Sequence, residues 1–316
     1  MRKLLALLLC LCLVCGVTAA LAEWPEKPIS VVIPAGPGGD TDTTSRAICE
    51  SLTQILGVPV QVVNMAGGAG TVAMNDVESS PADGYKLIYH HADTVLGTLL
   101  GRVDKPWNEM FDIAAVTGGG STNCIFVGKD SPYNSLEELF ADAKARPGEV
   151  SFAMETGGLV HLLILNIEQQ AGVTFNKVDA GASADRITAL LGGNVDVLLT
   201  VYGSAKGYVE SGDFKCLGIL AAERNPNLPD VPTLAECGVN ATYEHFYYFG
   251  FKAGTDPEIV NKFAAAVQQA ALEGPYTEAL NKYYFTANVR VGQDAVDYMM
   301  GVQNFFKPLT DALSAQ

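Results

Sequence analysis

The chain has 316 residues, of which 48% are hydrophobic and 17% are charged, so it can bury a sizeable core and is not a disordered segment. The formal net charge is −15 at pH 7, from 35 acidic and 20 basic side chains. Such a surface repels phosphate backbones and anionic lipid, which argues against nucleic-acid binding and peripheral membrane binding. The length suits one large α/β domain or two domains of ordinary size.

The first 22 residues have the layout of a secretory signal peptide. A basic start, Arg2-Lys3, precedes an apolar run over residues 4–17, and Ala20-Leu21-Ala22 is a small-x-small cleavage site. We therefore expect export, cleavage near Ala22 and a periplasmic or otherwise extracytoplasmic mature protein. An uncleaved anchor is the alternative, although the run is short for a membrane span. The bulky valine before Cys15 disfavours lipid anchoring at that cysteine.

Four cysteines follow the signal segment, at positions 49, 124, 216 and 237. Their wide spacing does not resemble a metal-binding knuckle. Two interpretations stay open: Cys49, Cys124, Cys216 and Cys237 are small buried hydrophobic residues, or they form one or two disulfides in an oxidising compartment.

After the signal segment, strands alternate with glycine-rich loops and helices. Predicted strands at 29–33, 60–63 and 86–89 are separated by a helix over 41–56 and by a helix that begins near Thr71. This alternation predicts a parallel sheet with helices on its faces. Ligands of such sheets bind at the loops that follow the carboxyl ends of the strands.

The same theme continues to the end of the chain. The predicted elements are strands at 124–128, 150–154, 195–200, 214–220 and 246–251, and helices at 135–145, 161–170, 188–191, 257–272 and 294–312. The chain has neither an internal repeat nor a low-complexity linker, so any two domains would be joined by strands.

No local motif indicates catalysis or a metal site. The chain lacks a Gly-x-Ser-x-Gly elbow, and none of its four histidines forms a His-x-x-x-His pair. Asp40 and Asp42 fall in the first turn of a predicted helix, where acidic residues usually complement the helix dipole. Residues 68–73 fit the Gly-x-Gly-x-x-Ala dinucleotide fingerprint, but the next strand ends in His90-His91 and not in an acidic residue. We therefore expect no enzyme activity, no cofactor and no metal.

Two loops rich in backbone donors are the strongest signal that remains. Residues 37–41 and 67–71 each combine glycines with the start of a helix. Glycines allow a ligand to approach the backbone closely, and the free N–H groups of a helix start attract an anion. The alternative is that both loops are tight turns without a ligand.

Short motifs in a fixed order make the chain similar to a known family. They are Trp24-Pro25-Glu26-Lys27-Pro28-Ile29, Pro34 to Gly39 with Asp42 and Arg46, Asn64 with Gly67 to Thr71, Pro81-Ala82-Asp83-Gly84-Tyr85, Ser131-Pro132, Ser135 to Leu139, His161-Leu162, Ala189 to Gly193 with Val195-Asp196, and Arg224 through Pro229 to Thr233 with Glu236 and Gly238. Together they resemble the extracytoplasmic solute receptors of tripartite tricarboxylate transporters, the Bug receptors.

The resemblance implies an α/β, two-lobed periplasmic-binding-protein fold of type II, the Venus flytrap. Each lobe would be a mainly parallel sheet flanked by helices. The chain would cross between lobes twice, near Gly120 and near His245. Lobe 1 would comprise residues 23–121 and 247–316, and lobe 2 residues 122–246.

The resemblance also implies a ligand-binding site and partners. The ligand would be a small carboxylate: a di- or tricarboxylate, an amino acid or an aromatic acid. The protein would be a monomer that delivers this acid to a membrane permease made of two other proteins. The site residues that carry over from lobe 1 are Gly38, Gly39, Asp40, Thr41, Asp42, Gly67, Gly68, Ala69, Gly70, Thr71, His90, Asp93 and Thr94. Those that carry over from lobe 2 are Glu155, Thr156, Gly157, Gly158, Asp179, Ala180, Gly181, Ala182, Thr200 and Ser204.

The second-lobe loops depart from the family pattern. Glu155 stands where the family usually has glycine, and Gly158 stands where it usually has a hydroxyl residue. Either Glu155 points to solvent and complements a helix start, or it pairs with a positive group on the ligand, such as an ammonium. His161 is expected to be a structural histidine.

The expected function is capture of a small organic acid outside the cytoplasmic membrane for handover to a transporter. Two alternatives remain. The same fold could serve as the ligand-sensing partner of a sensor kinase, or the chain could be a secreted α/β enzyme.

Overall fold

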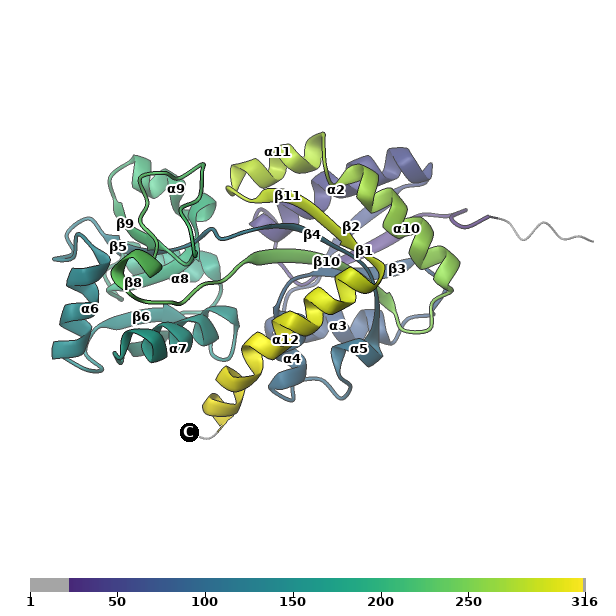
Figure 1. The fold of residues 1–316 in the computed structure, drawn as a ribbon. Helices are drawn as coiled ribbons and strands as arrows, with labels where there is room; N and C mark the ends of the chain where they lie inside the picture. Colours follow the sequence, from purple (N-terminus) through teal and green to yellow (C-terminus); the bar gives the residue numbers. More distant parts are fainter. Residues whose placement is uncertain (1–22, 315–316) are drawn as a thin grey trace, which may run out of the picture.

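A computed structural model describes residues 23–314 as two α/β lobes, each built on its own sheet (Figure 1). The predicted signal peptide lies outside the described residues. Within them, no helix combines the length and apolar character that a membrane crossing requires.

The first lobe contains a six-stranded sheet in the order β11-β4-β10-β3-β1-β2. Its strands are β1 (Ile29–Ile33), β2 (Val60–Asn64), β3 (Lys86–His90), β4 (Phe111–Gly120), β10 (His245–Lys252) and β11 (Thr286–Val291). The β-branched run of β1 is fully enclosed because β2 and β3 pair with it on both sides, in parallel.

Helices cover both faces of this sheet. On one face lie α2 (Asp40–Leu56), α10 (Pro257–Ala270) and α11 (Pro275–Lys282), which pack on one another (Figure 1). On the other face lie the short η1 (Gly68–Gly70), α3 (Thr71–Glu78), α4 (Asp93–Leu99), α5 (Trp107–Met110) and α12 (Gly292–Ser314).

The second lobe contains a five-stranded sheet in the order β7-β6-β8-β5-β9. Its strands are β5 (Asn123–Gly128), β6 (Ser151–Met154), β7 (Asn176–Asp179), β8 (Val197–Val201) and β9 (Phe214–Ile219). Its helices are α6 (Leu136–Ala145), α7 (Leu159–Ala171), α8 (Ser183–Leu191), α9 (Tyr202–Glu210) and the short η2 (Ala235–Cys237). Residues of β6 alternate between two cores, because Phe152 belongs to the same core cluster as α7 and Ala153 to the same cluster as α8.

The two-lobed α/β expectation is confirmed. Both sheets are mixed, with four of six strands in the first and four of five in the second running in one direction. Parallel pairing is confined to β2-β1-β3 and to β7-β6-β8. The other neighbours are antiparallel because β10 and β11 in the first sheet and β5 in the second run opposite to the remaining strands.

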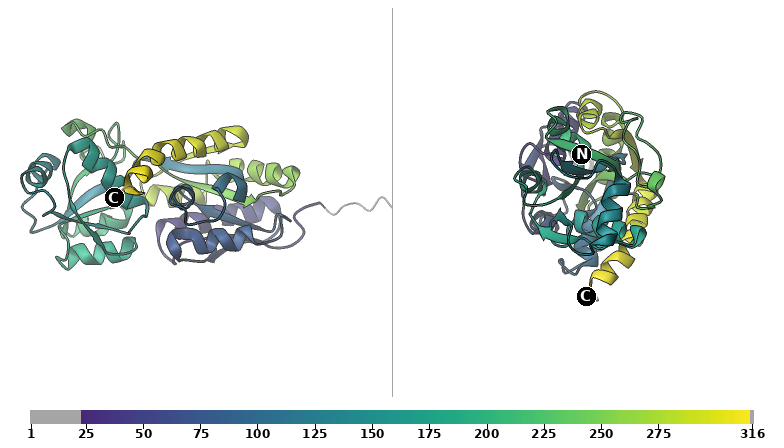
Figure 2. Two further views of the ribbon diagram at one scale, coloured as in Figure 1. Left: turned by 90° about the horizontal axis from the view of Figure 1, so that it is seen from below. Right: turned by 90° about the vertical axis from the view of Figure 1, so that its left-hand side faces the viewer.

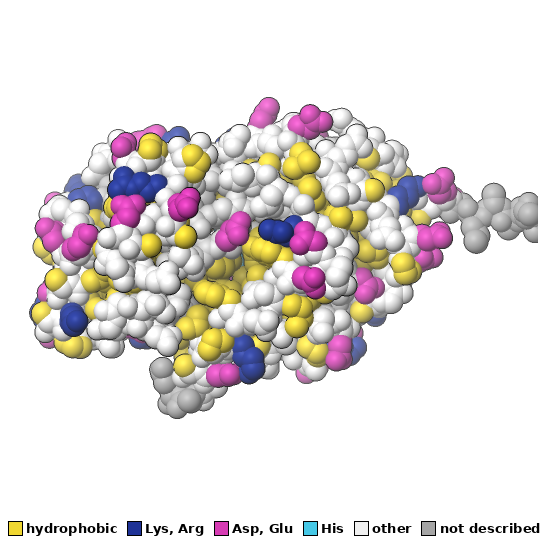
Figure 3. All heavy atoms as spheres, viewed as in Figure 1, with side chains coloured by type: hydrophobic (Ala, Val, Ile, Leu, Met, Phe, Trp, Pro, Cys, Tyr) yellow, Lys and Arg dark blue, Asp and Glu magenta, His cyan; other side chains and the backbone are white. Residues whose placement is uncertain are grey.

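The chain passes from the first sheet to the second between Gly120 and Asn123, and it returns at His245. The C-terminal helix α12 adds a third link, because it packs on α4 and β4 of the first lobe and on α7 of the second. Figure 2 shows α12 lying along the first lobe with its C-terminal end next to the second. On the face seen in Figure 1, apolar side chains gather in the middle of the molecule and charged ones lie scattered around them (Figure 3).

All four cysteines of the described chain are free in this structure. Cys49 and Cys124 are buried and belong to the hydrophobic cores, whereas Cys216 and Cys237 are partly exposed. The two buried thiols therefore act as small apolar side chains.

Candidate functional site

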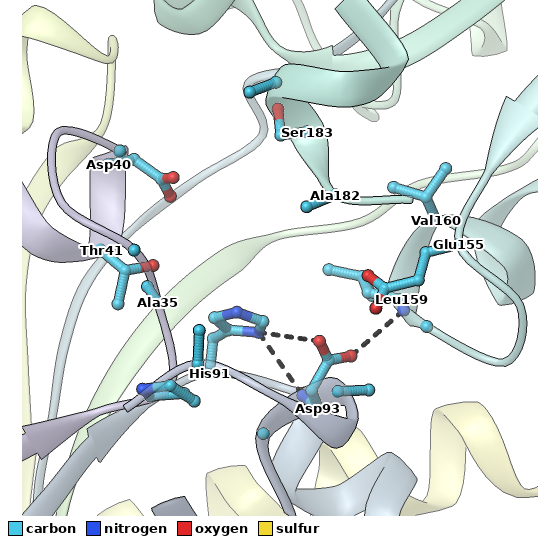
Figure 4. A pocket seen from close by; sticks show the side chains of 18 of the residues that line it. Ala35, Asp40, Thr41, His91, Asp93, Glu155, Leu159, Val160, Ala182 and Ser183 are labelled. Atoms are coloured by element: carbon cyan, nitrogen blue, oxygen red, sulfur yellow. Dashed lines mark hydrogen bonds and ion pairs between the residues drawn. The ribbon is translucent and has the colours of Figure 1, made fainter. Parts of the chain in front are cut away.

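A cavity of about 440 Å³ lies between the lobes. Its wall consists of the loops that follow β1, β2 and β3 in the first lobe and β6, β7 and β8 in the second. Figure 4 shows residues of both lobes facing one another across this space. The carboxyl ends of parallel strands in both sheets therefore point at one site.

Thirteen of the predicted site residues line the cavity. They are Gly39, Asp40, Thr41, Gly67, Gly68, Ala69, Gly70, His90, Asp93, Glu155, Gly158, Ala182 and Thr200. The other predicted residues lie behind or beside the wall and do not line it: Gly38, Asp42, Thr71, Thr94, Thr156, Gly157, Asp179, Ala180, Gly181 and Ser204.

Asp42 holds the first loop in place. Its carboxylate accepts hydrogen bonds from the Gly38 amide at 2.9 Å, from Nε of Arg46 at 3.0 Å and from the Asn64 amide group at 2.9 Å. Burial opposes the charged form, but these donors outweigh it and lower the pKa of Asp42. Asp42 is therefore ionised and fully occupied by protein partners, so it positions the loop and does not face the ligand.

Asp179 and His161 do the same for the second-lobe loops. The Asp179 carboxylate accepts hydrogen bonds from the Thr156 hydroxyl and from the amides of Thr156 and Gly181, at 3.2 and 3.1 Å for the two amides. The Thr156 hydroxyl is the main cause of the lowered pKa of Asp179. Nδ1 of the buried His161 accepts a hydrogen bond from the Gly157 amide at 3.0 Å, so His161 is a structural histidine, as expected.

Four helices begin at the cavity wall with an N-cap residue that has no capping side chain. The N-cap residues of α2, α3, α7 and α8 are Gly39, Gly70, Gly158 and Ala182, and none of the four provides a side-chain hydrogen bond. All four residues line the cavity. Because the first N–H groups of a helix have no partner inside the helix, these starts aim donors and positive dipole ends at the same space. At the start of α7 one of these donors is already used, since the Leu159 amide donates to Asp93 Oδ1 of the opposite lobe.

Buried polar side-chain atoms without partners belong to residues of the same wall. Both ring nitrogens of His90 and of His245, the Asn123 amide nitrogen and Nε of Arg186 are buried and have no hydrogen-bond partner within the described chain. These four residues line the cavity. Leaving a buried polar group unpaired costs about 1–3 kcal/mol each, so the wall is arranged for a polar occupant.

Several lining residues were not among those predicted. They are Pro34, Ala35, Gly36, Pro37, Ala66, His91, Asn123, Leu159, Val160, Ser183, Ala184, Arg186, Val201 and His245. Most of them adjoin a predicted loop and would have been found by extending each loop by one or two residues. Arg186 and Asn123 lacked such a signal, because Arg186 lies inside α8 and Asn123 is the first residue of β5, so neither adjoins a predicted site loop.

The charges on the wall are unevenly balanced. Asp40, Asp93 and Glu155 line the cavity, whereas Arg186 is the one Lys or Arg side chain among the lining residues of the described chain. Arg186 is only 6% exposed, and its Nη1 donates to the Gly181 carbonyl at 2.8 Å. Its remaining donors are available to an acceptor in the cavity.

Glu155 is half-buried on the cavity wall and does not point into bulk solvent (Figure 4). Its Oε2 lies 3.5 Å from the place that a Cβ would take on Gly158. The two departures from the family pattern are therefore linked, since Glu155 folds over the position where residue 158 lacks a side chain. Burial and then the nearby Asp93 raise the pKa of Glu155.

His245 stands at the base of the cavity, where the chain returns to the first lobe. Its ring stacks on Phe285, with centroids 5.0 Å apart, and its Nε2 lies 3.8 Å from Asp40 Oδ2. That carboxylate oxygen also accepts a hydrogen bond from the Tyr247 hydroxyl at 2.6 Å. Burial lowers the pKa of His245 to about 4, so the ring is neutral at pH 7 and offers one donor and one acceptor.

The neutral His245 predicts a loss of stability in acid. The unfolded chain protonates this histidine near pH 6.5, whereas the folded state excludes the proton until about pH 4. The unfolded state therefore binds more protons in this window, and stability falls as the pH falls. At pH 5 the contribution is about 2 kcal/mol. Urea denaturation at pH 7 and pH 5 should show a smaller drop for His245→Gln than for wild type, and equal drops would contradict the assignment.

Within residues 23–314, no group of three or more His, Cys, Asp or Glu side chains is arranged to hold a metal ion. The donors on the wall are backbone N–H groups, imidazoles, an amide and a guanidinium, which suit an organic anion.

Comparisons with known proteins agree with this geometry. Residues 44–313 match the family model described as the tripartite tricarboxylate transporter family receptor. The chain is 31% identical to Protein BugT of Bordetella pertussis over 289 residues, which cover 88% of this chain and 87% of that protein.

Solved structures are similar over nearly the whole described chain. A TctC solute-binding protein from Polaromonas has a TM-score of 0.73 and 27% identity, covering 92% of this chain and 99% of that one. A Rhodopseudomonas palustris protein solved with adipate has a TM-score of 0.82 and 25% identity, covering 92% and 98%. These proteins and the match to the family model place the chain, in sequence and in fold, in the tripartite tricarboxylate transporter receptor family, whose members are solute-binding proteins.

Proposed function

We propose that this protein captures a small carboxylate outside the cytoplasmic membrane and delivers it to a membrane permease made of two other proteins. The observation that carries the proposal is the convergence of four helix starts that lack an N-cap side chain, and of four residues with buried, unpaired polar atoms, on one cavity. A carboxylate accepts several hydrogen bonds at once and is favoured at the positive end of a helix. The adipate bound to the Rhodopseudomonas palustris relative supports the same ligand class.

The cavity volume suits such a ligand. Small-molecule pockets usually enclose about 300–1,000 Å³, and 440 Å³ falls at the lower end of that range. A compact organic acid would fill it, with one carboxylate at the helix starts of α2 and α3 and the rest of the molecule against the second lobe.

Binding requires the lobes to close around the ligand, and no bond is made or broken. In the structure the second-lobe loops already contact the first lobe: Arg102 Nη2 donates to the Thr156 carbonyl at 3.3 Å, and the Leu159 amide donates to Asp93 Oδ1 at 3.1 Å. These contacts across the cleft would break when the lobes separate, as in hinge-bending receptors. We expect a monomer that is exported, with its signal peptide cleaved near Ala22.

Mass spectrometry of the small molecule carried by protein purified from the periplasmic fraction tests the ligand class directly. A thermal-shift screen of carboxylic acids tests it independently. Ligand at 100 times its Kd adds about 2.7 kcal/mol to the native state, which raises the unfolding midpoint by about 5–10 °C in a protein of this size. We expect at least one acid to give such a shift and to be recovered unchanged. A shift with nucleotides or sugars alone, or turnover of a bound acid, would refute the proposal.

A further inference from the structure

Two acidic residues of the cavity wall bear on the charge that the ligand must carry, and what they imply rests on the proposed function. Two acidic side chains, Asp93 from the first lobe and Glu155 from the second, meet at the start of α7 (Figure 4). Because the two carboxylates belong to different lobes, their repulsion is weak when the cleft is open and grows as it closes.

Asp93 contributes an attraction to closure. Its Oδ1 accepts a hydrogen bond from the Leu159 amide at 3.1 Å, so a first-lobe carboxylate caps the first turn of a second-lobe helix. Its Oδ2 lies 3.9 Å from Nδ1 of His91. A carboxylate at a helix start is favourable, so the contact made by Asp93 stabilises the closed arrangement of the lobes.

Glu155, in contrast, disfavours closure of the cleft. Its carboxylate makes no hydrogen bond or ion pair with another residue between 23 and 314, although the side chain is half-buried. Asp93 is the charged neighbour that most disfavours its ionised form. The closed cleft therefore leaves a partly desolvated carboxylate beside a second one, which is costly unless a positive charge joins them.

Arg186 and Arg102 supply only part of that charge, because both favour the ionised form of Glu155 without contacting it. Arg186 lies in the same wall, but no ion pair within 4.0 Å joins it to Glu155 or to Asp93 in the described chain. Arg186 is only 6% exposed, and its Nε has no partner within the described chain. Arg186 thus has a buried donor without an acceptor, and the nearby Glu155 carboxylate has no hydrogen-bond partner within the described chain.

We infer that Asp93 and Glu155 together bind an ammonium group of the ligand, and that closure of the cleft is conditional on this positive charge. The ligand is then an amino acid or another carboxylate that bears an amine. Its carboxylate groups lie at the helix starts and at Arg186, and its ammonium lies between Asp93 and Glu155. A plain dicarboxylate brings only negative charge and leaves the repulsion between the lobes in place.

Matched ligand pairs test this inference, because each pair differs by one ammonium group. Suitable pairs are succinate and aspartate, glutarate and glutamate, adipate and 2-aminoadipate, and 3-phenylpropionate and phenylalanine. Titration calorimetry gives the ratio of Kd values within each pair for wild type, for Glu155→Gln and for Glu223→Gln. Glu223 is an exposed second-lobe residue outside the cavity, so it controls for the loss of one negative charge.

For the pair whose carbon skeleton fits, wild type should favour the amine-bearing member by about 10- to 100-fold, the scale of a charge-assisted hydrogen bond. Glu155→Gln should reduce that preference by at least tenfold, mainly by weakening the amino acid, and Glu223→Gln should leave it unchanged. Small-angle scattering should show closure of wild type by the amine-bearing member and of Glu155→Gln by either member.

The failure of this inference can be told from that of the proposed function. Equal preference in wild type and Glu155→Gln, or tighter binding of the plain acid by wild type, would overturn the role of the acidic pair while leaving a carboxylate receptor. If no acid of either kind bound wild type or was carried by the purified protein, the proposed function would fall, and this inference with it.

Discussion

Replacing Gly203 with valine is expected to weaken ligand binding by about 10- to 100-fold. Gly203 lies in the first turn of α9, where a Cβ would meet the Tyr283 Cα at 2.6 Å and the Lys282 carbonyl oxygen at 2.7 Å. These atoms belong to the backbone of the first lobe, which cannot move aside as a flexible side chain does. The added side chain therefore holds the lobes apart, and overpacking of this kind costs about 1–3 kcal/mol in the closed state.

Gly207→Val is the matched control for the valine side chain added at position 203. Gly207 lies one turn later in α9, and a Cβ there would meet nothing within 4 Å. Both variants replace a helical glycine by the same residue, so their unfolding free energies without ligand should be similar. Titration calorimetry with the carried ligand should then show weak binding by Gly203→Val alone. Equal Kd values for the two variants would show that the lobes need not approach at this point.

Replacing Gly70 with alanine is expected to lower the free energy of unfolding by about 2–5 kcal/mol. Gly70 has a φ of 91°, a conformation that costs an L-residue about 1–2 kcal/mol. A Cβ at this position would also meet Nε2 of His90 at 2.4 Å, inside the contact distance of any two such atoms. Displacement of a buried histidine from a packed wall adds about 1–3 kcal/mol.

Gly38→Ala separates the two causes. Gly38 has the same φ of 91°, but a Cβ there would meet nothing within 4 Å. Urea denaturation should therefore give a loss of only about 1–2 kcal/mol for Gly38→Ala. The difference between the two variants measures the contact with His90. Equal losses would show that the ring of His90 moves aside at no cost.

The sequence predicted best the elements that are buried on all sides. The strand expected at 29–33 coincides with β1, because a β-branched run in the middle of a sheet has no other place to be buried. The helix expected at 135–145 follows a true cap, in which the Ser135 hydroxyl accepts from the Glu138 amide. Local side-chain chemistry decides both elements.

The elements that the sequence did not reveal depend on distant partners. β4 ends in Thr117 followed by three glycines, a composition typical of a loop, and it is a strand because β10 and β11 pair with it on both sides. β11 is an edge strand of half-buried residues without strict alternation. Pairing between segments so far apart in the chain has no local signature.

The site residues, too, fall into those that local sequence predicts and those that depend on distant parts of the chain. Glycine loops before helices could be recognised because backbone donors need glycine, and the cavity wall contains both loops. Arg186 was missed because an arginine in an amphipathic helix normally lies on the surface. Arg186 lines the cavity only because α8 faces the opposite lobe. The role of Glu155 likewise could not be predicted, because it depends on how close Asp93 of the other lobe lies.

The place of β10 in the first sheet has a consequence for how the molecule acquires its fold. β10 lies between β3 and β4, so the centre of the first sheet stays open until residues beyond the entire second lobe are available. The second lobe is built from one continuous stretch of chain and can form from more local contacts, which favours its earlier folding. Once compact, it holds the ends of β4 and β10 near each other and so reduces the entropy lost when the two strands meet. A substitution that slows the second lobe should therefore delay completion of the first as well, although the two have separate sheets.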